Sequence, residues 1–277
     1  MRRRLQGVKG WVFDVDGTLV LGDQRLSGYR ALPGAVALIE HLERAGVPFV
    51  AFTNGTTKSP RDYAATLERI GLAVGEARML TPVSVAIEVF RRRKFRKVLV
   101  LGVEGVWRPL ADAGLEVIVS PARADDAEVV LVGWHPEFGL QDLQAASAAL
   151  WGGAALYVVS VAPYFASAGG RVLGISGAIV AALRNITGKR ATVLGKPSVQ
   201  AMRYASQRLG VPAAQIAVVG DDPVLEVGMA LRAGAIAIGV HTGLNDAAAF
   251  ASLEPQDRPH LSLAGVHELL PLLEAAS

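Results

Sequence analysis

The sequence predicts an α/β protein in which a parallel sheet is covered by helices and a second α/β domain is inserted into the first. Short apolar runs alternate with amphipathic stretches along the chain, a pattern typical of parallel strands joined by helices. Glycine, proline and helix-capping residues separate the two kinds of segment. Polar motifs follow strands in the first and last parts of the chain, whereas residues from about 80 to 190 contain strands and helices without comparable acidic motifs.

The expected strands are short runs rich in β-branched and other apolar residues. Such runs are typical of strands that are buried on both faces of a sheet. In chain order they span residues 11–15, 48–53, 97–101, 115–119, 129–132, 156–160, 216–220 and 235–240.

Three of the expected helices have clear ends. Ser59 is placed to cap a helix that begins at Pro60, and Gly71 follows its last turn, where glycine readily adopts the left-handed conformation that ends helices. Helices are expected by the same reasoning over 34–44 and 198–209. We therefore expect one domain to comprise residues 1–80 and 189–277, and the inserted domain to comprise 81–188.

Composition excludes several classes of protein. The chain has 277 residues, 51% of them hydrophobic and 19% charged, which indicates a globular protein rather than a disordered one. Cysteine is absent, so disulfides, thiolate metal sites and cysteine nucleophiles are excluded, and a reducing cytoplasm is the expected location.

The Ser176 hydroxyl is expected to cap a further helix in the inserted domain.

The charge distribution argues against nucleic acid and membrane partners. The net charge is +3, and the basic residues concentrate in 2–4 and 91–94 rather than along one stripe. No apolar stretch reaches the length of a membrane span. Charged residues at Lys9 and Asp14 interrupt the first apolar run, so no signal peptide is expected.

The first polar motif follows the first expected strand. Asp14 and Asp16 are separated by one residue, so on an extended strand their side chains point the same way, and Gly17 permits a turn directly after them. Two carboxylates can divide the work of phosphoryl transfer: one attacks phosphorus, and the other gives a proton to the leaving oxygen and later takes one from water. Alone, such a motif is far more often a polar loop that follows a strand.

Two further motifs supply groups that suit a phosphate. Thr53, Asn54 and Gly55 follow the second strand and offer a hydroxyl, an amide and a turn with free backbone N–H groups. Lys196 follows an apolar run and precedes a helix, where its ammonium can neutralise phosphate charge and reduce the repulsion between a nucleophilic carboxylate and an anionic substrate.

The last motif adds more carboxylates. Asp221 and Asp222 follow the strand 216–220. Close to Asp14 and Asp16 they would repel one another unless a cation joined them. A hard dication with oxygen ligands fits this need, and Mg²⁺ is the expected cofactor because it bridges carboxylate, water and phosphate.

The four motifs in this order resemble those of the haloacid dehalogenase superfamily. The insertion lies between the second and third motifs, and the sequences of 53–59 and 195–198 are similar to the subclass of NagD-type and p-nitrophenylphosphatase-like enzymes. The resemblance implies a Rossmann-like core with an inserted α/β cap. It also implies Asp14 as nucleophile, Asp16 as general acid/base, Lys196 as charge stabiliser, and Thr53 and Asn54 as phosphate contacts.

The resemblance implies a metal site as well. Mg²⁺ is expected on Asp14, the backbone carbonyl of Asp16 and Asp221. Glu226 stands where relatives carry an aspartate, and we favour it over Asp222 as further support for the metal.

The inserted domain departs from the family pattern. A polar sequence that usually ends one cap strand is replaced by Ser160 to Ala162, and His135 stands in place of an acid. Contacts to a polar substrate are therefore missing, and we expect a different substrate specificity. His135 either contacts an anionic substrate or has a structural role.

Together these features predict a cytoplasmic, Mg²⁺-dependent phosphatase that hydrolyses a small phosphorylated metabolite through an aspartyl-phosphate. One alternative is a non-catalytic phosphometabolite-binding or regulatory protein with the same fold, and another is a phosphomutase. Metal-dependent turnover would separate the enzyme from the binding protein. A homo-oligomer is compatible with the aromatic and alanine-rich surface of the inserted domain.

Overall fold

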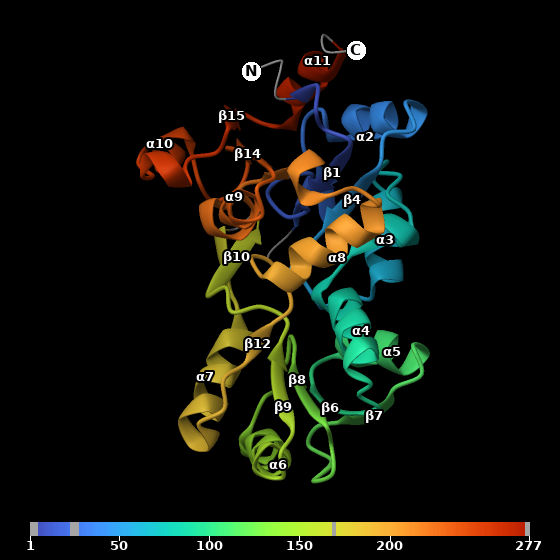
Figure 1. Cartoon of the computed structure of the whole chain (residues 1–277), viewed down its shortest axis with the longest axis vertical. Helices are drawn as coiled ribbons and strands as arrows, with labels where there is room; N and C mark the ends of the chain where they lie inside the picture. The colour runs from blue at the N-terminus through green and yellow to red at the C-terminus, as the bar shows by residue number, and fades with distance from the viewer. Residues whose placement is uncertain (1–4, 23–27, 168–169, 275–277) are drawn as a thin grey trace.

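The computed structural model describes residues 5–22, 28–167 and 170–274. Two parallel sheets, each with its own helices, lie at opposite ends of the long axis of the molecule (Figure 1). The first and last parts of the chain, coloured blue and orange to red, form one end, here called the core. The middle part, coloured green to yellow, forms the other end, here called the cap.

The core contains a six-stranded parallel sheet in the order β15-β14-β13-β1-β4-β5. Its strands are β1 (Gly10–Phe13), β4 (Phe49–Phe52), β5 (Met79–Leu80), β13 (Ile216–Gly220), β14 (Ile236–Val240) and β15 (Leu261–Leu263). Its helices are α2 (Ala35–Arg44), α3 (Pro60–Glu68), α8 (Val199–Leu209), α9 (Gly228–Arg232), α10 (Ala247–Ala251) and α11 (Leu269–Glu274). A small antiparallel hairpin joins β2 (Val20–Gly22) to β3 (Tyr29–Ala31).

The central strand β1 explains why the core strands are apolar throughout. Val12 belongs to one hydrophobic cluster, whereas Trp11 and Phe13 belong to another. Successive side chains of a strand point to opposite faces, so β1 is buried on both sides and carries no polar face.

The cap contains a five-stranded parallel sheet in the order β12-β9-β8-β6-β7. Its strands are β6 (Lys97–Leu101), β7 (Glu116–Val119), β8 (Val129–Val132), β9 (Ala155–Val158) and β12 (Thr192–Val193), and β10 (Tyr164–Ser167) pairs with β11 (Gly170–Leu173) in a separate hairpin. The helices of this part of the chain are α4 (Pro82–Arg93), α5 (Glu104–Asp112), α6 (Leu140–Trp151) and α7 (Ile175–Thr187).

Core and cap share buried contacts. Helix α4 leads out of the core and packs against α8 of the core and α5 of the cap. Val12 and Phe52 from the core sheet lie in the same hydrophobic cluster as Val98 and Leu131 from the cap sheet. The expected domain bounds at 80/81 and 188/189 stay a prediction, and β12 pairs with the cap sheet although it follows the second bound.

The eight expected strands are all present, with ends shifted by at most two residues. The helix caps at Ser59 and Ser198 are also present, because each hydroxyl accepts a hydrogen bond from the backbone N–H three residues ahead, at 3.1 Å in both cases. The expected cap at Ser176 is wrong: this residue lies inside α7, and its hydroxyl donates to Gly133 O at 2.8 Å instead.

The strands that the sequence did not predict are β2, β3, β5, β10, β11, β12 and β15, which have two to four residues each. None of these strands is a continuous apolar run of four residues, the signal by which β4 and β8 were recognised. Within residues 5–22, 28–167 and 170–274, no helix is long and apolar enough to cross a membrane.

Candidate active site

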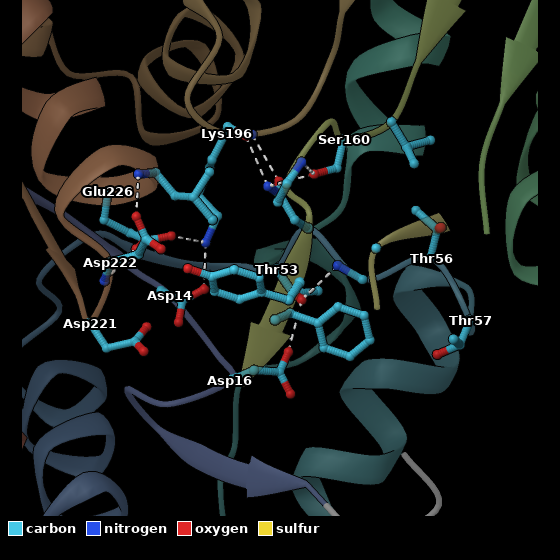
Figure 2. Close-up of a pocket in the computed structure, with 18 of the residues that line it drawn as sticks. Asp14, Asp16, Thr53, Thr56, Thr57, Ser160, Lys196, Asp221, Asp222 and Glu226 are labelled. Carbon is cyan, nitrogen blue, oxygen red and sulfur yellow. Dashed lines mark hydrogen bonds and ion pairs between the residues drawn. The ribbon is translucent and has the colours of Figure 1, made fainter. Parts of the chain in front are cut away.

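A pocket lies at the carboxyl ends of the core strands and faces the cap (Figure 2). Ligands of open parallel sheets bind at this edge. Asp14 follows β1, Thr53 follows β4, and Asp221 follows β13, while Lys196 precedes α8. All four residues line the pocket together with Asp16, so the fold brings four separate sequence motifs to one place.

Asp14 and Lys196 form a buried ion pair. The backbone N–H of Asp14 donates to Val219 O at 2.9 Å, which fixes the residue at the end of the sheet. Lys196 is only 1% exposed and also pairs with Glu226, at 2.6 Å from Nζ to Oε1. Burial alone would lower the pKa of Lys196, but the charges of Asp14 and Glu226 outweigh burial and raise it, so the ammonium stays charged.

The surroundings of Asp16 favour the protonated form of its carboxyl group. Its Oδ2 accepts a hydrogen bond from Thr53 Oγ1 at 3.0 Å. Burial, followed by the charge of Asp14, raises its pKa to about 6, although hydrogen bonds from Thr53 and Tyr29 and the charge of Lys196 oppose this rise. Asp16 can therefore keep a proton at a higher pH than an exposed aspartate, and Thr53 orients the carboxyl group that carries it.

The loop after β4 joins three parts of the site. Gly55 N–H donates to Thr53 Oγ1 at 2.9 Å. Asn54 Nδ2 donates to Lys196 O at 2.9 Å and to Ser160 Oγ at 3.4 Å, and Lys196 N–H donates to Asn54 Oδ1 at 2.8 Å. The Asn54 side chain thus joins the loop after β4 to the Lys196 backbone and to Ser160 of the cap. The predicted phosphate contacts at Thr53, Asn54 and Gly55 stay a prediction.

Asp221 approaches the turn after β1 closely. Gly17 has a φ of 96°, and a Cβ atom at this position would lie 2.6 Å from Asp221 Oδ2, so only glycine fits both the conformation and the space. Asp221 Oδ2 accepts a hydrogen bond from Leu244 N–H at 3.1 Å. Burial, followed by the charge of Asp14, raises the pKa of Asp221 to about 7.

The two candidates for further metal support are placed differently. Asp222 Oδ1 accepts hydrogen bonds from Val224 N–H at 2.7 Å and Leu225 N–H at 2.9 Å, which caps the π-helical turn 223–227. The Glu226 carboxylate accepts from Asp222 N–H at 3.1 Å and pairs with Lys196. Burial raises the pKa of Glu226 although Lys196 opposes the rise. The Glu226 side chain is one methylene longer than that of aspartate, and its carboxylate reaches Lys196. A role for Glu226 at a metal stays a prediction.

The oxygen atoms of this site fit a hard cation such as Mg²⁺. Of the described residues that line the pocket, five are carboxylates and one, Lys196, is a cation. Asp14 and Asp221 are each 6% exposed, and this surplus of buried negative charge suits a dication. Among the described residues, no three acidic or histidine side chains gather into a complete cation cage. The donor set therefore requires other oxygens, such as the Asp16 backbone carbonyl, water and phosphate.

Several lining residues were not predicted as site residues. Tyr29 reaches the pocket from the hairpin β2–β3, and Tyr164 and Phe165 reach it from β10. Neither hairpin was expected, and no motif marks these aromatic residues. His135 does not line the pocket; its Nε2 lies 3.2 Å from Asp142 Oδ1 and its ring lies against Phe138, surroundings that favour the structural role.

Comparisons with known proteins agree with this geometry. The model of the haloacid dehalogenase-like hydrolase family matches residues 11–116, and a second HAD-hydrolase-like model matches 193–269. Phospholysine phosphohistidine inorganic pyrophosphate phosphatase of Rattus norvegicus is 30% identical over 242 residues, which cover 87% of this chain and 85% of the relative.

Solved structures are similar over nearly the whole chain. A p-nitrophenyl phosphatase of Archaeoglobus fulgidus has a TM-score of 0.84 and 27% identity, and the match covers 95% of this chain and 98% of that one. A glycerol phosphate phosphatase of Mycobacterium tuberculosis, solved with magnesium, has a TM-score of 0.81 and 27% identity, over 96% of this chain and 77% of that one.

Proposed function

Because this chain belongs to the haloacid dehalogenase-like hydrolases, we propose that it is a Mg²⁺-dependent phosphatase of a small phosphorylated metabolite. The membership predicted from the four motifs is confirmed by the family match. The observation that carries the proposal is the convergence of Asp14, Asp16 and Lys196 on one pocket, with Asp14 Oδ2 buried and without a hydrogen-bond partner. That oxygen is available to attack phosphorus.

In the proposed first step, Asp14 Oδ2 attacks phosphorus and the bond from phosphorus to the leaving oxygen breaks, which leaves an aspartyl-phosphate on Asp14. Asp16 gives its proton to the leaving oxygen. In the second step Asp16 takes a proton from water, whose oxygen attacks phosphorus and releases phosphate and free Asp14. The pKa of Asp16, raised to about 6, supports its role as proton donor and acceptor.

Three other residues support these steps. Lys196 reduces the repulsion between Asp14 and the anionic phosphate. Thr53 holds the Asp16 carboxyl group through a hydrogen bond of 3.0 Å. Asn54 keeps the loops that carry Thr53 and Lys196 together.

We assign Mg²⁺ to Asp14, the Asp16 carbonyl and Asp221, with Glu226 as further support through a water. When bound, the cation would neutralise phosphate charge and help to align the phosphoryl group. We also propose that the cap, over about 81–188, closes on the core during the reaction and opens for product release.

The test is phosphate release from p-nitrophenyl phosphate and a panel of phosphometabolites, with Mg²⁺ or EDTA. We expect turnover only with Mg²⁺, and a loss of about a thousandfold or more in Asp14→Asn. Asp112→Asn, which changes an exposed aspartate at the end of α5, is the matched control and should keep full activity.

The same preparation separates enzyme from binding protein. A folded protein that Mg²⁺ and inorganic phosphate stabilise against heat, but that turns over no substrate, would contradict the catalytic proposal and favour the non-catalytic alternative.

A further inference from the structure

Within residues 5–22, 28–167 and 170–274, the charged residues that line the pocket are all on the core side. They are Asp14, Asp16, Lys196, Asp221, Asp222 and Glu226, and the proposed chemistry at phosphorus uses this end of the pocket. The cap side is formed, among the described residues, by Val159, Ala162, Tyr164, Phe165, Gly174 and two serines. A leaving group that extends from phosphorus toward the cap therefore meets no fixed charge there.

The two serines of the cap wall are already hydrogen-bonded within the protein. Ser176 Oγ donates to Gly133 O at 2.8 Å. Ser160 Oγ accepts from Ala162 N–H at 3.1 Å and from Asn54 Nδ2 at 3.4 Å. These hydroxyls hold the cap together and tie it to the core, and as neutral groups they give a charged leaving group no counter-charge.

The two aromatic rings of the cap wall contact side chains that lie outside the pocket lining. The Phe165 ring lies 5.9 Å from the Trp134 ring at an interplanar angle of 72°, an arrangement favoured for aromatic pairs. The Arg171 guanidinium lies over the Tyr164 ring at 4.2 Å from its centroid, and Arg171 does not line the pocket. The charge of Arg171 therefore faces a ring of the protein rather than the ligand space.

A second cation stands near the pocket without lining it. Lys58 Nζ lies 5.3 Å from the centroid of the Tyr29 ring and 5.6 Å from that of Tyr63. Both tyrosines line the pocket, whereas Lys58 does not. A tyrosine phenol is uncharged near pH 7, so these side walls are neutral as well.

We propose that the substrate is a phosphate monoester whose leaving group is small, uncharged and mainly apolar, an inference that rests on the phosphatase function proposed above. Burial of an unpaired carboxylate or ammonium is costly, and the cap wall offers neither charge a partner. The free space in the pocket is about 90 Å³, so a leaving group of few atoms fits without movement of the cap.

The test compares substrates of matched size. Isobutyl phosphate and phosphoglycolate differ in whether the leaving group ends in methyl groups or a carboxylate, and n-propyl phosphate and phosphoethanolamine differ in a methyl group against an ammonium. With Mg²⁺ present, we expect kcat/KM to be at least about tenfold higher for the uncharged member of each pair. Equal or higher values for either charged member would overturn the inference.

Turnover of p-nitrophenyl phosphate distinguishes failure of the substrate assignment from failure of the phosphatase proposal. Turnover of this compound without discrimination in the matched pairs would overturn the substrate assignment and leave the phosphatase proposal standing. No turnover of any compound, p-nitrophenyl phosphate included, would overturn both.

A charge placed in the cap wall should change the preference. Phe165→Arg offers a partner for a carboxylate, and we expect it to shift the kcat/KM ratio toward phosphoglycolate by about tenfold or more. Leu173→Arg, at a position on β11 that is 68% exposed, is the control for added charge on the cap and should leave the ratio unchanged. Equal ratios in folded Phe165→Arg and Leu173→Arg would contradict a leaving-group site at Phe165.

Discussion

The ammonium of Lys196 balances the negative charge of two buried carboxylates, and its removal should show how strongly the stability of the protein depends on this balance. In Lys196→Met the side chain keeps a similar length while Asp14 and Glu226 lose their cationic partner (Figure 2). These groups are all at least 94% buried, since Asp14 is 6%, Lys196 1% and Glu226 1% exposed. Leaving one side of a buried ion pair without its partner costs about 3–5 kcal/mol.

For a chain of this size, 1 kcal/mol corresponds to about 2–4 °C in Tm, so we expect a fall of roughly 6–20 °C. Differential scanning calorimetry of the metal-free protein at pH 8 measures it. Lys97→Met is the matched control, because Lys97 also contacts two carboxylates, Glu116 at 3.1 Å and Asp126 at 2.8 Å, but on the surface. Solvent and salt weaken such pairs, and its Tm should change by no more than about 2 °C.

The deficit should depend on pH in a defined direction. Burial already raises the pKa of Glu226, and loss of Lys196 raises it further. A carboxylate whose pKa is higher in the folded state destabilises the fold once pH exceeds its unfolded value, so the Tm deficit of Lys196→Met should be smaller at pH 5 than at pH 8. Glu226→Gln in the same background should restore part of the loss. A deficit no larger than that of Lys97→Met would refute this reasoning.

Three other predictions concern the same pocket. Thr53→Val removes the hydroxyl that donates to Asp16 at 3.0 Å; kcat should fall about tenfold to a hundredfold in steady-state assays, and Thr53→Ser should retain most of it. Asp16 and Asp221 have pKa values raised to about 6 and about 7, so the metal-free protein should lose stability as pH rises from 5 to 8. Mg²⁺ should therefore raise Tm more at pH 8 than at pH 5. An equal gain in Tm at both pH values would argue against these carboxylates as the cation site. Gly17→Ala places a Cβ atom against Asp221 at a φ of 96°, so calorimetric titration should show weaker Mg²⁺ binding than in wild type, whereas Gly46→Ala, where nothing lies within 4 Å, should bind Mg²⁺ normally.

Local sequence signals predicted the scaffold because they arise from local physics. A strand such as β13, Ile216–Gly220, is apolar on both faces because both faces are buried, so five residues suffice to identify it. Ser59 and Ser198 cap helices through hydrogen bonds to residues three positions away. Such local contacts can be predicted from the sequence alone. Gly17 was predicted to allow a turn, and its positive φ confirms this.

The sequence by itself also determined the chemical repertoire of the site: two carboxylates after β1, a hydroxyl and an amide after β4, a lysine before α8 and acids after β13. These residues meet because parallel strands place their carboxyl ends at one edge. Only the tertiary structure decided which side chains face each other. Glu226 reaches Lys196, and Asn54 binds the backbone of Lys196 142 positions away, because contacts between distant residues depend on packing rather than on local pattern. The same packing brings the unpredicted hairpin residues Tyr164 and Phe165 to the pocket, where they form part of its lining.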